Sequence, residues 1–240
     1  MDLPPLAILY EDNHCVAIWK PPGALTTGYE GGEETLDRQV KAYLKDKHGK
    51  PGNVFLGVVH RLDRPVSGVL LFARNSKAAG RLAELFRTAK VRKLYWGVVP
   101  GTVQPATGRL EDWLWKDRLS GIVSVTVPHA PEARHALLHY QTLGVADELT
   151  WLGLYPQTGR THQLRVQLAS RGHPLLGDTK YRSTLVFPTG IALHARSLTF
   201  LHPIRYEPIT VTAEVPESWQ SLAATGWDFK QAEAKRAGES

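Results

Sequence analysis

The stretch from His60 to Arg74, HRLDRPVSGVLLFAR, constrains the fold more than any other part of the chain. Asp63 stands between Arg61 and Arg64, and the apolar run 69–73 follows after a proline. A short apolar run of this kind is typical of a strand that is buried on both faces. The sequence therefore predicts a sheet that covers this strand, with Asp63 on the loop that enters it. Such loops often carry function, although Asp63 could equally form only a surface charge pair with its neighbouring arginines.

The remaining patterns predict an α+β protein with more strand than helix. Apolar and β-branched runs predict strands at 7–10, 16–19, 54–59, 69–73, 93–99, 108–114, 121–127, 136–143, 149–154, 191–200 and 209–215. Helical spacing of apolar residues predicts helices from Thr35 to 49, from Asn75 or Ser76 to about 89, and from Thr161 to Gly172. The short strands between 95 and 154 alternate with turns rich in glycine and proline, which indicates an antiparallel meander.

The chain of 240 residues contains no internal repeat and no linker rich in proline or serine. We therefore expect a single domain over 1–228, a mobile glycine-rich loop over 26–34 and a polar tail over 229–240. The N-terminus lacks the features of a secretory signal, and no window approaches the ~18 apolar residues of a membrane span. A lone cysteine, Cys15, excludes an internal disulfide and argues against a cysteine-based zinc cage. These features predict a cytoplasmic protein that does not bind membranes.

The net charge of +6 favours a polyanionic partner. Seven of the cations lie between Arg74 and Lys93, where Glu84 is the one acid. They could form a surface that holds phosphates, or simply the solvated face of a helix. Lys20, which precedes the Pro-Pro-Gly stop at 21–23, could bind a phosphate or could be an ordinary lysine at the end of a strand.

A second group of polar residues lies between Pro156 and Gly172, in PQTGRTHQLRVQLASRG. Arg165 stands beside the apolar stripe of the predicted helix, so it should point toward the protein. Burial of an unpaired guanidinium is costly, which predicts an anionic partner for Arg165. Alternatively, its aliphatic stem packs while the charged head reaches solvent.

Taken together, these motifs resemble those of the RluA family of RNA pseudouridine synthases. The resemblance covers roughly residues 9 to 203 and rests on KPPG, HRLDRPVSGVLLFAR, KLYWGVV, TGRTHQLRVQLASRGHPLLGDTKY and LHARSLTFLHP. It implies the pseudouridine synthase fold, a mixed and mostly antiparallel sheet with flanking helices and a central catalytic cleft. It also implies that Asp63 is the catalytic aspartate, that Tyr95 lies against the target base and that Arg165 pairs with Asp63.

The same resemblance implies that Arg61 enters the RNA stack and helps to extrude the uridine. Further candidates for RNA contacts lie in the same motifs, and they are Lys20, Arg64, Lys93, Arg160, His162 and Gln163. Many relatives carry an N-terminal S4-type RNA-binding module, which we do not expect here. The expected partner is a structured RNA, transfer RNA or ribosomal RNA, and the expected oligomeric state is a monomer.

The implied reaction is an isomerisation that breaks the N1–C1′ bond of uridine and joins C5 to C1′. It needs no metal or cofactor, and the chain contains no motif of the phosphate-loop, dinucleotide or zinc-protease type. Its ten histidines are scattered, and we expect no metal site. A carboxylate can serve either as the nucleophile or as a base at C2′. A paired guanidinium would keep that carboxylate ionised and fix its orientation.

Two rival functions remain open from the sequence. A non-catalytic RNA-binding protein could use the same fold, although the presence of Asp63, Tyr95 and Arg165 argues against it. A nucleosidase or glycosylase would attack a similar bond, but such enzymes usually pair an acid with a base or use an acidic metal site. The surroundings of Asp63 are basic instead.

Overall fold

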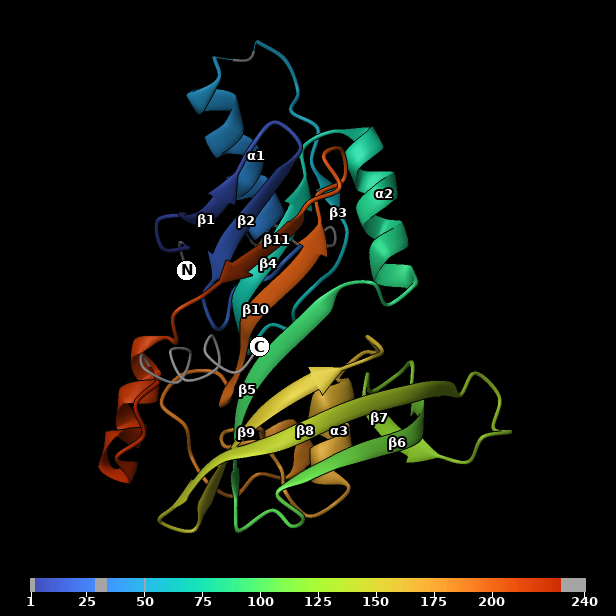
Figure 1. Ribbon diagram of the computed structural model, residues 1–240, viewed down its shortest axis with the longest axis vertical. Helices are drawn as coiled ribbons and strands as arrows, with labels where there is room; N and C mark the ends of the chain where they lie inside the picture. Colours follow the sequence, from blue (N-terminus) through green and yellow to red (C-terminus); the bar gives the residue numbers. More distant parts are fainter. Residues whose placement is uncertain (1–2, 29–33, 50, 230–240) are drawn as a thin grey trace. The chain divides into compact units, whose positions relative to one another are not determined.

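The computed structural model describes residues 3–28, 34–49 and 51–229 (Figure 1). The chain divides into two compact units, one of Met1–Leu94 with Ala195–Ala213 and the other of Tyr95–His194 with Glu214–Ser240. The single domain expected over 1–228 stays a prediction. Much of the expected mobile loop and all but the first residue of the expected tail lie outside the described residues.

The first unit is organised around β4 (Ser67–Ala73), whose residues are all buried. Its neighbours are β2 (Cys15–Lys20) and β10 (Leu193–Leu201), while β1 (Ala7–Glu11) pairs with β2 and β11 (Pro208–Thr212) with β10. The short β3 (Gly57–Val58) also pairs with β4. The strand predicted from the apolar run is therefore confirmed, and it is an interior strand as the absence of alternation indicated.

Two helices belong to the first unit, α1 (Leu36–Lys47) and α2 (Ser76–Arg87). The Asn75 side chain accepts a hydrogen bond from the backbone N–H of Ala78 at 2.9 Å, which is the N-cap interaction expected before α2. Ala78 and Leu82 of α2 pack into the same core as Val69 and Leu71 of β4. Both predicted helices are confirmed, and the apolar stripe of α2 faces the sheet.

The second unit contains an antiparallel sheet in the order β5, β9, β8, β6, β7. The predicted antiparallel pairing is confirmed, but the predicted meander is wrong, because β5 pairs with β9 rather than β6, and β8 pairs with β6 rather than β7. Its strands are β5 (Arg92–Pro100, whose first residues belong to the first unit), β6 (Thr107–Lys116), β7 (Val123–Thr126), β8 (Arg134–Ala146) and β9 (Leu149–Pro156). The helix α3 (Gln163–Ala169) packs Val166 against Leu114, Val123 and Ala136 of this sheet.

Antiparallel pairing dominates both units. It joins β1 with β2, β2 and β3 with β4, and β10 with β11 in the first unit. In the second it joins β5 with β9, β9 with β8, β8 with β6, and β6 with β7. The expected mostly antiparallel sheet is therefore confirmed.

Two local predictions are wrong, and two short helices were missed. The strand expected at 54–59 shrinks to Gly57–Val58, and the apolar side chains of Phe55 and Val58 are exposed. Thr161 does not cap α3, since the N-cap position is His162 in the left-handed region at φ 51°. The short helices η1 (Thr179–Tyr181) and η2 (Glu217–Thr225) were not predicted, because runs this short carry little periodicity. Among the helices of the described residues, none has the length and apolar character needed to cross a lipid bilayer.

Candidate active site

Lys20 fastens the loop that carries Asp63. It ends β2, is completely buried, and its Nζ donates to the carbonyl oxygens of Pro21 at 3.0 Å, Arg64 at 3.0 Å and Val66 at 2.7 Å. Burial lowers the pKa of Lys20 to about 7, and the nearby Asp63 carboxylate opposes that shift. Lys20 could bind a phosphate or be an ordinary lysine at the end of a strand, and the structure favours the second interpretation. Its amino group donates to three backbone carbonyls and does not reach solvent.

Gly23 and Thr26, which follow Lys20 in the chain, also form hydrogen bonds to the loop that carries Asp63. The Thr26 hydroxyl donates to the carbonyl of Leu62 at 3.2 Å and accepts from its N–H at 3.4 Å. Gly23 donates its N–H to the Arg64 carbonyl at 2.8 Å, and the Arg64 Nε donates back to the Gly23 carbonyl at 3.0 Å. The residues on both sides of the half-buried Asp63 are therefore tied to the 20–26 segment.

His60 anchors the start of the loop to the central strand. Its Nε2 accepts the backbone N–H of Leu71 at 2.9 Å, and its ring stacks on Phe86 of α2 with 4.6 Å between centroids. Burial, with a smaller contribution from Lys93, lowers the pKa of His60 to about 3. His60 is therefore neutral at physiological pH, and it orients the loop through an acceptor bond that only the neutral ring can make.

At least three of the seven cations between Arg74 and Lys93 form bonds within the protein. The Arg74 side chain is 9% exposed and pairs with Glu11 at 3.0 Å. Arg81 of α2 donates to the Pro203 carbonyl at 2.7 Å, and Arg87 pairs with Glu84. These bonds favour the interpretation of this segment as a helix face rather than as a dedicated phosphate surface.

Arg165 has the anionic partner that its position predicted. It is 4% exposed, its Nε donates to Asp178 Oδ2 at 2.7 Å, and its Nη2 donates to Asp178 Oδ1 at 2.8 Å. The guanidinium also lies over the ring of Tyr181, 5.1 Å from the centroid. The alternative of a head in solvent is wrong. Asp178 was missed as the partner, although a search for a buried acid within the GDTKY part of the motif could have found it, and the pairing of Arg165 with Asp63 stays a prediction.

Gln163 shapes the loop that precedes α3. It is 4% exposed, and its Oε1 accepts from the Thr158 hydroxyl at 2.7 Å and from the Arg160 N–H at 3.0 Å. Its Nε2 donates to the carbonyl of Leu137 on β8 at 3.1 Å. Because these bonds face the protein, the structure supports a positioning role for Gln163 and not a direct RNA contact.

His162, the N-cap residue of α3, contacts the hydroxyl group of Tyr181. The backbone N–H of Val123 donates to the Tyr181 hydroxyl at 3.2 Å, so the hydroxyl hydrogen can be donated to His162 Nδ1, which lies 2.8 Å away. Tyr181 thus supports both His162 and Arg165, and it too was missed from the sequence.

The other candidates are exposed or half-buried. Arg61 and Arg64 beside Asp63 are exposed, as is Arg160, while Lys93 is half-buried. Tyr95 is a half-buried residue of β5 that stands opposite Leu154 of β9.

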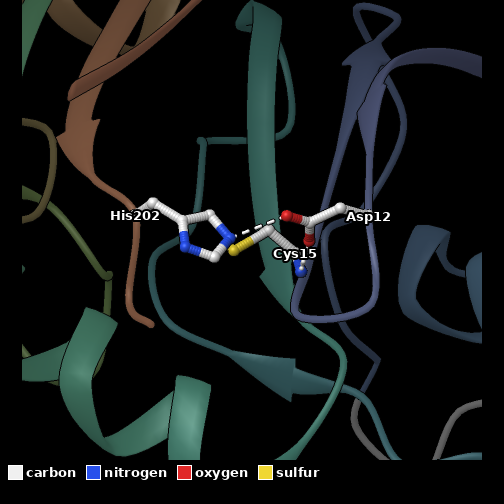
Figure 2. A group of neighbouring side chains, drawn as sticks. All are labelled: Asp12, Cys15 and His202. Atoms are coloured by element: carbon white, nitrogen blue, oxygen red, sulfur yellow. Dashed lines mark hydrogen bonds and ion pairs between the residues drawn. The ribbon is translucent and has the colours of Figure 1, made fainter. Parts of the chain in front are cut away.

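A group of three side chains that the sequence did not predict, Asp12, Cys15 and His202, comes together in the first unit (Figure 2). His202 Nδ1 accepts the backbone N–H groups of Ile204 and Arg205, so Nε2 carries the hydrogen that is donated to Asp12 Oδ2 at 2.7 Å. Burial raises the pKa of Cys15 to about 12. A metal would need the lone pair of His202 Nε2 and the Cys15 thiolate. The hydrogen bonds of His202 and the raised pKa of Cys15 therefore favour a structural role for this group over a metal site.

A family model described as RNA pseudouridylate synthase matches residues 14–170, which is more than half of the chain. The chain belongs to the RluA-type RNA pseudouridine synthases. It is therefore an isomerase that acts on RNA, as the resemblance implied.

Individual relatives agree with this assignment. The synthase is 36% identical to tRNA pseudouridine synthase C of Haemophilus influenzae, over 93% of this chain and 99% of the relative. It is 35% identical to ribosomal large subunit pseudouridine synthase D of Xylella fastidiosa, over 92% of this chain and 69% of the relative. Among solved structures, human RNA pseudouridylate synthase domain containing 4 superposes with a TM-score of 0.76 at 26% identity, covering 90% of this chain and 93% of the human one.

Proposed function

We propose that this synthase converts uridine to pseudouridine in a transfer RNA or a ribosomal RNA, with Asp63 as the catalytic carboxylate. Support for the two substrate classes comes from the relatives, one named for transfer RNA and the other for the large ribosomal subunit, which are almost equally similar to this chain. We further propose that the enzyme works as a cytoplasmic monomer without a metal or cofactor.

The observation that carries the proposal is the bracing of the Asp63 loop. Lys20, Thr26 and His60 fix the backbone before and after Asp63, so the carboxylate starts from a rigid, half-buried position. A fixed reacting group lowers the entropic cost of reaching the transition state. A carboxylate that must attack C1′ or remove a proton from C2′ gains directly from such positioning.

The reaction itself redistributes bonds without an external reagent. The N1–C1′ bond breaks, the uracil turns, the C5–C1′ bond forms, and the proton lost from C5 is balanced by one gained at N1. In this proposal Arg165 pairs with the Asp63 carboxylate, and Tyr95 lies against the uracil ring. The guanidinium of Arg165 is buried and makes two hydrogen bonds to Asp178. These bonds already fix its orientation, which suits the guanidinium to hold a second carboxylate.

RNA recognition is assigned to the cations around the two motifs. Extrusion of a stacked uridine costs on the order of a few kcal/mol, and base stacking on an aromatic ring returns roughly 1–3 kcal/mol. We assign the insertion into the RNA stack to the exposed Arg61, and further RNA contacts to Arg64, Lys93, Arg160 and His162. Lys20 and Gln163 support the loops instead, because their polar groups bind the protein backbone.

The test of the catalytic role is release of tritium from RNA that contains 5-tritiated uridine. Asp63→Asn should fold and bind RNA but release no tritium, because the amide can neither attack nor abstract a proton. Asp46→Asn, on the exposed side of α1, is the matched control and should keep full activity. Substantial release by Asp63→Asn would remove Asp63 from catalysis. The substrate class is then read from pseudouridine mapping of total RNA with and without the gene, where a lost site names the RNA.

A further inference from the structure

A groove of about 460 Å³ opens on the second unit, where β6, β7 and β8 meet the loop before α3. Four cations and one acid line it, and all five side chains are exposed: Lys116, Arg118, Arg134, Arg160 and Glu132. Gly159 and Thr161 of the second motif complete its rim. The groove is therefore cationic and continuous with the loop that leads to Arg165.

Strand geometry explains why the cations gather there. Leu114 stands opposite Arg134 of β8, and Lys116 stands opposite Val123 of β7. Residues two apart on a strand share a face, so Leu114 and Lys116 project to the same side. The buried Leu114 and Val123 form the floor, and the long cationic side chains form the walls. Trp115 lies between them in sequence and projects to the opposite face.

The chemistry of the lining selects the occupant. RNA bases bind mainly by stacking on aromatic rings, and none of the side chains that line the groove is aromatic. Phosphates are bound by arginine, lysine, hydroxyl groups and backbone N–H groups, which is what this groove offers. Arg160 is already fixed by its Nε bond to the His135 carbonyl at 2.8 Å, which engages one of its five N–H donors.

We propose that this groove binds phosphodiester groups of the substrate RNA. The inference rests on the proposed function, because it assumes that the polyanion is the RNA substrate. Glu132 regulates the affinity. It pairs with Arg118, and these two side chains are 57% and 80% exposed, so a phosphate can displace the Glu132 carboxylate at little cost.

The test uses the salt dependence of RNA binding in the full chain, in an Asp63→Asn background that prevents turnover. Affinity for a fluorescent transfer RNA transcript and for a large-subunit ribosomal RNA fragment is measured by anisotropy between about 50 and 200 mM KCl. Each phosphate contact contributes roughly 0.7–0.9 to the slope of log affinity against log salt. Lys116→Gln and Arg134→Gln should each flatten the slope by that amount, for every RNA tested.

Glu132→Gln should act in the opposite direction, because it releases Arg118 and removes a repulsive charge. We expect up to about fivefold tighter binding, the equivalent of an exposed ion pair. Lys45→Gln changes an exposed lysine of α1 and removes one positive charge, as Lys116→Gln and Arg134→Gln do; it is the control and should leave the slope unchanged. All four positions are exposed, so the variants should melt like the parent.

Unchanged slopes and affinities in the groove variants would overturn the proposal. So would tighter binding of polyglutamate than of RNA at the groove, since the occupant would then be an acidic protein. Tritium release by the Asp63-containing enzyme separates this failure from failure of the proposed function. If the enzyme releases tritium but the groove variants keep the parental slope, only the groove assignment is wrong. If groove-dependent binding is present without tritium release, only the catalytic assignment is wrong.

Discussion

Replacement of Asp178 by asparagine should destabilise the second unit strongly. The carboxylate of Asp178 receives two hydrogen bonds from Arg165, at 2.7 and 2.8 Å, and the Asp178 and Arg165 side chains are 1% and 5% exposed. Asparagine keeps the volume but removes the charge. Its amide N–H₂ also turns a donor toward the guanidinium, where a carboxylate oxygen accepted before.

The size of the effect follows from the burial of the pair. Two unit charges about 4 Å apart attract by roughly 4 kcal/mol at an effective dielectric constant of about 20. Removal of one partner from a buried ion pair typically costs about 3–5 kcal/mol, because the other charge is left uncompensated. A chain of this size loses roughly 2–4 °C in Tm for each kcal/mol. Asp178→Asn should therefore lower Tm by roughly 6–20 °C.

The assay is urea unfolding of a double-mutant cycle with Arg165→Met and Asp178→Leu. The double variant should be more stable than either single variant, because it leaves no buried charge without its partner. Arg165→Lys should also lose stability, since an ammonium group cannot make both bonds in the planar geometry of a guanidinium. A coupling energy below about 1 kcal/mol would refute the argument that this pair fixes Arg165.

Two further predictions concern the first unit. The pKa of His60 is lowered to about 3 in the folded state, whereas a histidine in the unfolded chain has a pKa of about 6.5. Between these two values the unfolded state binds a proton at His60 and the folded state does not. The free energy of unfolding should then fall by up to about 1.4 kcal/mol for each pH unit below about 6.5, and His60→Asn should lose this dependence. If the free energy of unfolding changes equally between pH of about 7 and 5 in the parent and in His60→Asn, the prediction is contradicted. Gly68→Ala should abolish folding, because its φ is +120° and the new Cβ would lie 2.3 Å from the Ala195 carbonyl oxygen. Gly80→Ala, exposed on α2 with no atom near the new Cβ, should instead stabilise by about 0.5–1 kcal/mol, and equal melting of the two variants would count against the steric argument.

The sequence predicted the strands well where composition and burial agree. The run at 69–73 is uniformly apolar, and the strands of the second unit have turn residues between them, so local chemistry alone identifies them. The stretch 54–59 is also mostly apolar, yet only Gly57 and Val58 pair with β4. Whether Phe55 is buried depends on which surface faces it, and no local pattern carries that information.

The partners within the candidate site were harder to predict than the residues themselves. Lys20 was singled out from the sequence, but its role follows from the register of β2 with β4, which places Lys20 opposite Gly68. That register directs the Lys20 side chain toward the carbonyls of Arg64 and Val66, 44 and 46 residues away in sequence. The role of Asp178 could not be predicted either, because its contact with Arg165 depends on how the segment after α3 folds back onto the helix.

These contacts divide the motif residues into two kinds. Lys20 and Asp178 are buried and bind other parts of the protein, whereas Asp63 and Arg61 lie on a braced loop with access to a ligand. Both kinds stand in the same motifs, as expected if the charged groups proposed to act on RNA need buried polar groups to hold them. The two kinds should therefore separate in experiment. Changes at Lys20 or Asp178 should lower stability and turnover together, and changes at Asp63 or Arg61 should lower turnover while the protein stays as stable as before.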